Sequence, residues 1–523
     1  MGSLVKGPRV LAEFWKKSNT LQKVFVFFGL SILFRIFFAS VVGLADDEAY
    51  HWSWTKNLSL SYYDHPAMIA WLEAISTSIL GDTRWGVRLP AFLCYLGTAY
   101  LAWKLAREVF GIWAANFCAF LMLWTPLWGF GGYVASPETP FMLCWVAAAY
   151  VFWQNVREDG KAWPLKKTWL WLGVIMGLGL NSKFIIALLA PGFGLYLLMT
   201  PKHRKDLLSK WPWTGMLIAT VICLPIFIWN LHYDWPGFRY QFHDRHTTTE
   251  FSFNRWLQFF TAQILFYTPV AYGLMLYTFG YSFVKRQEAR WRWLFCMTVP
   301  SIVMFYPQPL WAEYKPHWSG PAFLLLAMGA GALWSEGVEW HGKTKIKPFS
   351  SKITWGILGF ILLVNLITYL PFVYPWMPKA ARAINPQAEW HPKYDLSNEF
   401  SGWPELGDYV NRRQREIHAE SGKKPFIASN RYETTAQTYW GTKQKTYMLS
   451  TTKSQYTVTQ TPQEMEALHG DTALFVTTDK YPTDPMGWAK FDECKPEEFK
   501  TYRHDEVARI FKVWICTNFQ GIK

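Results

Sequence analysis

The chain has 523 residues, of which 51% are hydrophobic, and its 52 Lys and Arg against 38 Asp and Glu give a formal net charge of +14. This charge does not indicate nucleic-acid binding, because the basic residues lie in short segments between apolar runs and form no basic patch on a polar domain. The apolar runs fill the first three quarters of the chain, which excludes an ordinary soluble protein and predicts an α-helical polytopic membrane protein.

The apolar runs, taken in chain order, predict about eleven membrane-spanning helices, since a hydrocarbon core of about 30 Å needs about 20 apolar residues in a helix. We expect these spans at 24–43, 86–106, 112–130, 138–156, 168–182, 184–200, 212–230, 257–283, 292–306, 318–334 and 354–373. The first run is too long for the apolar region of a signal peptide, so we expect an uncleaved span. A shorter apolar stretch at 67–80 is expected to lie along the membrane interface.

The connections between these runs alternate in charge, which predicts their sidedness. Basic residues concentrate at the N-terminus and at 104–107, 157–167, 202–210, 285–292 and 343–352. By the positive-inside rule these segments are cytoplasmic. The other connections, and everything after residue 373, then face outward. We therefore expect a transmembrane domain at 1–373 and a periplasmic soluble domain at 374–523, in a bacterial inner membrane.

The polar tail has the pattern of a small α/β domain. Strands are expected at 424–429, 472–476 and 508–516, and a short helix at 432–439. The tail contains two cysteines, Cys494 and Cys516. Outside the cytoplasm such a pair is kept oxidised, so we expect a disulfide. The alternative is two free thiols, with Cys516 buried in its strand.

The first outward loop begins with three consecutive acids, Asp46, Asp47 and Glu48. Mutual repulsion and partial burial would raise at least one of their pKa values, which suits acid/base chemistry or metal binding. The alternative is a solvated helix start, where acids are favourable. Asp47 and His51 would share a helix face at i, i+4, so a divalent metal held by these two residues remains an alternative.

The other outward segments add further acids, bases and cations on the same side of the membrane. The candidates are Tyr63, Asp64 and His65 in the first loop, Glu138, Lys183, then His243, Arg245 and His246, and finally Lys315 and His317. This set fits glycosyl transfer from a lipid phosphate. A carboxylate would deprotonate the acceptor hydroxyl, and cations would stabilise the departing phosphate.

Several of these motifs resemble the protein O-mannosyltransferase superfamily, which includes the lipid A aminoarabinose transferases. Asp47-Glu48 followed by Tyr63-Asp64-His65-Pro66 is similar to its first-loop signature. Stretches similar to the bacterial branch lie at 136–140, 181–183, 230–232, 239–245, 315–318, 402–407 and 430–433. The chain departs from the family pattern at Ala67, where a second proline is frequent, and at Asp46, which leaves the assignment of the base open by one residue.

The resemblance implies a GT-C fold and an inverting transfer from a polyprenyl-phosphate sugar. Asp47 would be the catalytic base, accompanied by Glu48 and by Glu138 as a second acid. Lys183, Arg245 and Lys315 would contact the donor phosphate. The acceptor would be a hydroxyl or phosphate of lipid A, another envelope glycan or a protein.

Two other classes of function agree less well with the sequence. A transporter or flippase of lipid-linked sugars should carry charged residues at mid-membrane depth, and the apolar runs contain almost none. A non-catalytic scaffold would not need the clustered acids of the first loop. The sequence names neither the sugar nor the acceptor.

Overall fold

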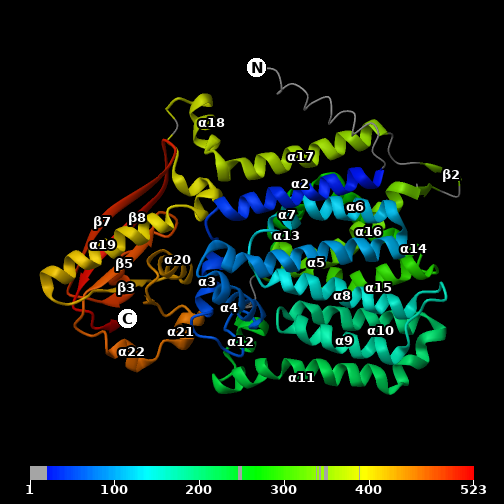
Figure 1. Ribbon diagram of the computed structural model, residues 1–523, viewed down its shortest axis with the longest axis horizontal. Helices are drawn as coiled ribbons and strands as arrows, with labels where there is room; N and C mark the ends of the chain where they lie inside the picture. The colour runs from blue at the N-terminus through cyan, green and yellow to red at the C-terminus, as the bar shows by residue number, and fades with distance from the viewer. Residues whose placement is uncertain (1–19, 245–249, 337, 341–342, 347–350, 388) are drawn as a thin grey trace.

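The computed structural model describes residues 20–523 except 245–249, 337, 341–342, 347–350 and 388. Long helices lie side by side in one bundle, and the tail packs against the end of this bundle (Figure 1). The bundle helices are α2 (Thr20–Val41), α5 (Arg84–Phe110), α6 (Ile112–Trp124), α8 (Glu138–Val156), α9 (Leu165–Leu180), α10 (Leu189–Met199), α11 (Lys210–His232), α14 (Pro269–Val284), α15 (Ala289–Phe305), α16 (Gly320–Glu336) and α17 (Ser351–Val373).

Most of the expected spans correspond to one helix each, but some are interrupted. The expected span at 257–283 is not one continuous helix, because α13 (Phe253–Tyr267) and α14 meet at an angle of 109°. Thr268, between them, has a φ of 70° and precedes Pro269. A residue before proline is disfavoured in the α conformation, so the helix ends there. The run at 112–130 is likewise divided before Pro126 into α6 and the short α7 (Pro126–Phe130).

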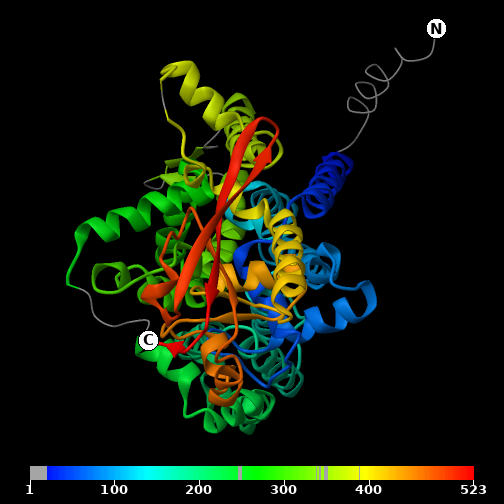
Figure 2. The same cartoon turned by 90° about the vertical axis from the view of Figure 1, so that its left-hand side faces the viewer.

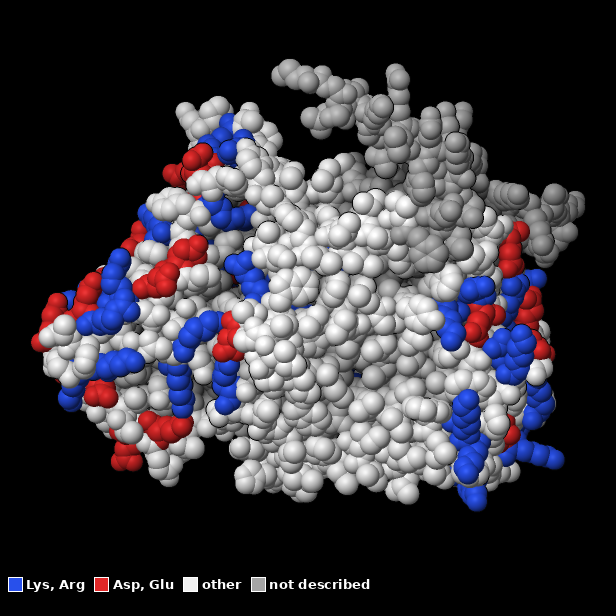
Figure 3. Space-filling model, viewed as in Figure 1, with Lys and Arg blue, Asp and Glu red and all other residues white. Residues whose placement is uncertain are grey.

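By length and composition, α11 is the one described helix that could cross a membrane without a bend. Three bent pairs raise the number to four if each pair is one span: α2 with α3 (Asp46–Trp54), α13 with α14, and α17 with α18 (Trp376–Ile384). Charged residues on the face shown in Figure 3 gather at the two ends of the molecule, with a band of other residues between them. An apolar band of this kind is what a membrane-embedded bundle presents to lipid.

The centre of the bundle is α16, whose residues from Gly320 to Leu333 are all buried. Its small residues permit close helix packing: a Cβ added to Gly331 would lie 2.7 Å from the Cα of Ala114 in α6. A larger side chain there would have to displace backbone. Small residues at such contacts are typical of helices that associate within membranes.

The first outer loop folds into two short helices beside the bundle. α3 begins at Asp46, and the backbone N–H of Ala45 donates to the Glu48 carboxylate over 2.9 Å, which caps the helix start. The stretch expected at 67–80 forms α4 (Met68–Leu80). Every residue of α3 except Asp47 is buried.

The tail forms a five-stranded sheet in the order β4-β3-β5-β8-β7. The strands are β3 (Phe426–Ser429), β4 (Thr446–Met448), β5 (Ala473–Thr478), β7 (Glu493–Arg503) and β8 (Glu506–Thr517). β3 is parallel to β4 and β5, whereas β8 is antiparallel to β5 and β7. The three expected strands and the expected helix, α20 (Tyr432–Thr442), are confirmed. β7 was not expected from the sequence, because its side chains are mostly polar.

Figure 2, in which the tail faces the viewer, shows β7 and β8 as a long ribbon across the end of the bundle. Cys494 and Cys516 lie opposite each other on these strands and form the expected disulfide. α19 (Trp403–Ser421) packs on one face of the sheet through Trp403, Leu406 and Val410. α20 lies between the sheet and α3 and joins the tail to the first loop.

Candidate active site

A cavity of about 970 Å³ opens where the first loop, the start of α8, the segment before α16 and the tail meet. Its polar lining brings together most of the residues expected from the sequence. These are Asp47, His51, Asp64, His65, Glu138, Lys183, Lys315 and His317, joined by Tyr50, Tyr240, Glu399 and Tyr432. Side chains such as Met122, Leu127 and Phe372 make much of the remaining wall apolar.

Asp47 is the exposed residue of α3, and its side chain faces this cavity. The side chain is open to the cavity but lies deep within the protein, and the resulting desolvation raises the pKa of Asp47 to about 6. Glu138, Glu399 and Glu433 add to the rise, and Lys315 opposes it. A carboxylate with a pKa near neutrality is suited to act as a general base.

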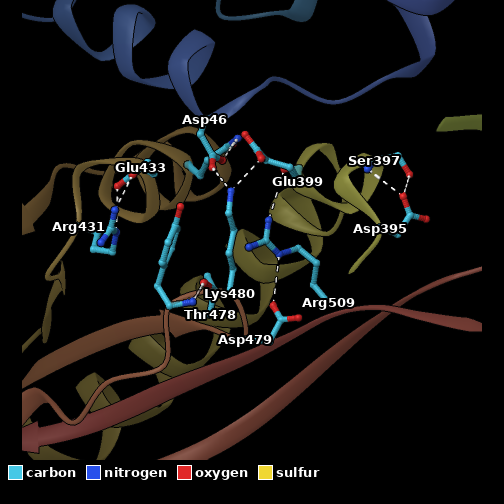
Figure 4. A network of polar contacts seen from close by, with 12 residues as sticks. Asp46, Asp395, Ser397, Glu399, Arg431, Glu433, Thr478, Asp479, Lys480 and Arg509 are labelled. Atoms are coloured by element: carbon cyan, nitrogen blue, oxygen red, sulfur yellow. Dashed lines mark hydrogen bonds and ion pairs between the residues drawn. The ribbon is translucent and has the colours of Figure 1, made fainter. Parts of the chain in front are cut away.

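The neighbouring Asp46 points into the tail and does not line the cavity (Figure 4). Its carboxylate accepts a hydrogen bond from Gln437 over 3.1 Å and lies 4.0 Å from the Lys480 ammonium. Lys480 is itself paired with Glu399 at 2.9 Å. Burial, with Glu399 nearby, raises the pKa of Asp46 to about 8, although Arg509 and Lys480 oppose the rise. These surroundings favour the neutral form of Asp46 more than that of Asp47.

Glu48 lies outside the cavity lining and is fully buried in an ion pair with Arg88 of α5. Its carboxylate accepts from Arg88 Nε and Nη2 over 2.8 and 2.6 Å, and from the backbone N–H groups of Ala45 and Ala135 over 2.9 and 2.8 Å. Both oxygens are fully engaged, so Glu48 is not placed to accept a proton from a substrate. Arg88 was not among the expected site residues, although an arginine inside an apolar run indicates a buried polar partner.

Glu138 and Lys183 form an ion pair on the cavity wall, and His317 Nε2 lies 3.2 Å from the same Glu138 oxygen. Lys183 is thus held by a carboxylate before any donor binds. Lys315 also lines the cavity, and its ammonium makes no hydrogen bond or ion pair with the residues that the structure describes. Of these two lysines, Lys315 is the one free to meet a phosphate.

The segment Tyr63-Asp64-His65 is held by hydrogen bonds from several parts of the chain. Tyr50 donates its hydroxyl to Asp64 over 2.5 Å, and Gln241 donates to the Asp64 carbonyl over 2.5 Å. Asp64 and His65 line the cavity, whereas Tyr63 lies behind them and packs against Tyr240.

The remaining candidates differ in their placement. Burial lowers the pKa of His51 to about 4, so this side chain is neutral at physiological pH. His243 pairs with Asp244 at 3.0 Å on the surface, away from the cavity. Arg245 and His246 lie outside the described residues. Among the residues that are described, no group of three or more His, Cys, Asp or Glu could hold a metal ion, so Asp47 and His51 lack further ligands of these types.

The chain resembles known proteins in both sequence and structure. Residues 64–229 match a family described as dolichyl-phosphate-mannose-protein mannosyltransferase. The lipid A galacturonosyltransferase RgtD of Rhizobium johnstonii is 24% identical over 333 residues, which are 62% of this chain and 66% of that protein. The chain thus matches just under two thirds of that relative's length. An undecaprenyl phosphate-alpha-4-amino-4-deoxy-L-arabinose arabinosyl transferase of Pseudomonas fluorescens is 27% identical over 179 residues, 34% of this chain and 32% of that protein.

The similarity in structure extends over almost the whole chain. ArnT from Cupriavidus metallidurans, solved in the apo state and bound to undecaprenyl phosphate, superposes with a TM-score of 0.63 at 14% identity. The match covers 95% of this chain and 98% of ArnT. The chain therefore has the fold of ArnT, a helix bundle with a cavity where the bundle meets the tail. The expected resemblance is confirmed in sequence over residues 64–229 and in fold over almost the whole chain. One similar protein is named a lipid A galacturonosyltransferase.

Proposed function

We propose that the protein transfers a sugar from a polyprenyl-phosphate donor to a lipid A-type acceptor at the outer face of a bacterial inner membrane. The observation that carries the proposal is the cavity itself. The cavity is lined by Asp47, a carboxylate of near-neutral pKa, and by Lys315, whose ammonium pairs with no described residue. Its other walls are largely apolar. An amphipathic lipid-phosphate donor needs both kinds of surface.

The chemistry follows from these groups. Ionised Asp47 accepts the proton of the acceptor hydroxyl as the oxygen attacks the anomeric carbon of the sugar. The bond from that carbon to the phosphate oxygen breaks, and the polyprenyl phosphate leaves with the electron pair. Lys315 stabilises the growing negative charge of the phosphate. Attack opposite the leaving group inverts the anomeric centre, and the proton remains on Asp47 until solvent removes it.

The topology proposed with this function has about eleven spans, a cytoplasmic N-terminus and a periplasmic tail. Two features support it. Basic segments alternate with the outward segments along the sequence. The outward segments meet the tail at the cavity, and the tail carries the Cys494–Cys516 disulfide, which suits an oxidising compartment.

The direct test supplies the purified protein with undecaprenyl phosphate carrying a labelled sugar and with lipid A. We expect labelled lipid A and free undecaprenyl phosphate in equal amounts. Movement of the donor across a vesicle membrane without release of the free phosphate would instead show a flippase. A matched sample of the Asp47→Asn variant controls for contaminating transferases.

A further inference from the structure

The tail holds the first outer loop at two points that flank Asp47 along the sequence. The first point is Gln437 of α20, which is fully buried. Its side-chain amide donates to the carbonyl of Leu44 over 2.8 Å and to the Asp46 carboxylate over 3.1 Å. Gln437 therefore contacts the residue next to Asp47 and the turn that leads into α3.

The second point is Gln455 at the start of α21 (Gln455–Thr459). Its backbone N–H donates to the Tyr50 hydroxyl over 2.8 Å, and its side-chain oxygen accepts from the Tyr63 backbone N–H over 2.8 Å. The Tyr50 hydroxyl in turn donates to Asp64, which lines the cavity. The contact thus fixes both the α3 helix and the following segment.

These contacts matter because α3 cannot set its own orientation. It has nine residues, and helices shorter than about 12 residues are marginal on their own in water. The position of α3 must therefore come from packing, and the tail supplies much of this packing. The ring centroids of Tyr432 and Tyr50 lie 4.6 Å apart, and the Tyr456 hydroxyl donates to Ser53 over 2.8 Å. The Lys480–Glu399 pair lies beside the same helix start (Figure 4).

We propose that Gln437 and Gln455 are positioning residues for the transfer, because they hold α3 so that Asp47 faces the reacting hydroxyl. The inference rests on the proposed function, in which Asp47 is the base. It assigns the tail a role in the reaction, although the tail does not supply the base itself. A displacement of about 1 Å in a catalytic group can lower a rate about 100-fold, so even small loosening should be measurable.

The test replaces each glutamine with methionine, which keeps most of the volume and removes the hydrogen-bonding amide. In Gln455→Met the bond to the Tyr63 backbone N–H is lost, whereas the backbone bond to the Tyr50 hydroxyl remains. The matched control is Gln414→Met. Gln414 is also buried in the tail, but its bonds, to the Pro425 carbonyl over 2.7 Å and to Gln444 over 3.0 Å, stay within the tail. All three variants lose a buried amide, and the control leaves the first loop untouched.

We expect Gln437→Met and Gln455→Met to lower kcat about tenfold or more while the donor KM changes less than about twofold. Amide hydrogen exchange should become faster over residues 46–54 in Gln437→Met and over residues 62–65 in Gln455→Met, whereas Gln414→Met should change neither quantity. An unchanged kcat in both Gln437→Met and Gln455→Met, or an equal loss of kcat in Gln414→Met, would overturn the inference. Hydrogen exchange can be measured without turnover. If the wild-type protein is inactive but the variants show the expected exchange, the proposed function is refuted, whereas the contacts of Gln437 and Gln455 with the first loop are confirmed.

Discussion

At the scale of single residues, the two adjacent aspartates of the first loop have different surroundings and different expected roles. Asp47→Asn should lower the transfer rate by about 10²–10⁴, the usual effect of losing a general base. Asp46→Asn should have a much smaller effect, because Asp46 does not line the cavity and asparagine keeps its shape. Release of labelled donor by the two purified variants decides between them. Normal turnover in Asp47→Asn together with loss of turnover in Asp46→Asn would show that Asp46, and not Asp47, is the base.

The same residue predicts how the rate depends on pH. Asp47 acts as a base when it is ionised, and its pKa is raised to about 6. The kcat/KM should therefore be constant above this value and fall as the pH drops through it, approaching tenfold per pH unit. A profile measured between pH 4.5 and 8 checks this. A rate that stays nearly constant down to pH 4.5, as the ordinary aspartate pKa of about 3.9 would give, would show that Asp47 is not desolvated in solution.

At the scale of secondary-structure elements, the Glu48–Arg88 pair joins the first loop to the bundle. Arg88 also donates to the carbonyls of Ala39 and Val42, each over 2.9 Å, at the end of α2. The Glu48 carboxylate accepts a hydrogen bond from the backbone N–H of Ala135, in the turn before α8. The pair therefore connects α2, α3, α5 and α8 around the cavity.

Arg88→Met should leave Glu48 buried without its counter-charge and destabilise the protein by about 3–5 kcal/mol. The double variant Glu48→Gln with Arg88→Met should recover part of this loss, because the unpaired charge is gone. Thermal unfolding in detergent measures both. A single variant as stable as the wild type would show that Glu48 is solvated or neutral in the native protein.

At the scale of the whole molecule, the tail should lie on the outer side of the membrane with its two cysteines bonded. Thiol labelling of the denatured, unreduced protein should find Cys494 and Cys516 unreactive, and prior reduction should expose both. In spheroplasts, a membrane-impermeant label should react with a new cysteine at exposed Lys453 and not with one at exposed Lys202. Labelling of the Lys202 position alone would invert the proposed topology.

The sequence by itself determined the features that depend on local composition. Long apolar runs predicted the bundle helices, and short apolar segments in the polar tail predicted β3, β5 and β8. The acids after the first run located the loop that carries Asp47. Hydropathy and helix or strand periodicity are properties of neighbouring residues, so they can be read before any fold is known. The cysteine pair was likewise found from composition and expected sidedness.

The tertiary structure alone decided which polar groups meet. Glu48 and Lys183 have the chemistry expected of catalytic and phosphate-binding residues, but Arg88 and Glu138 already engage them. Asp46 and Asp47 are equivalent in the sequence, and the tail's Gln437, 391 residues from Asp46, makes them different. The free energy of an ionisable group depends on the charges and water around it, and these partners come from distant parts of the chain. Hydropathy and periodicity, which describe neighbouring residues, could not reveal them.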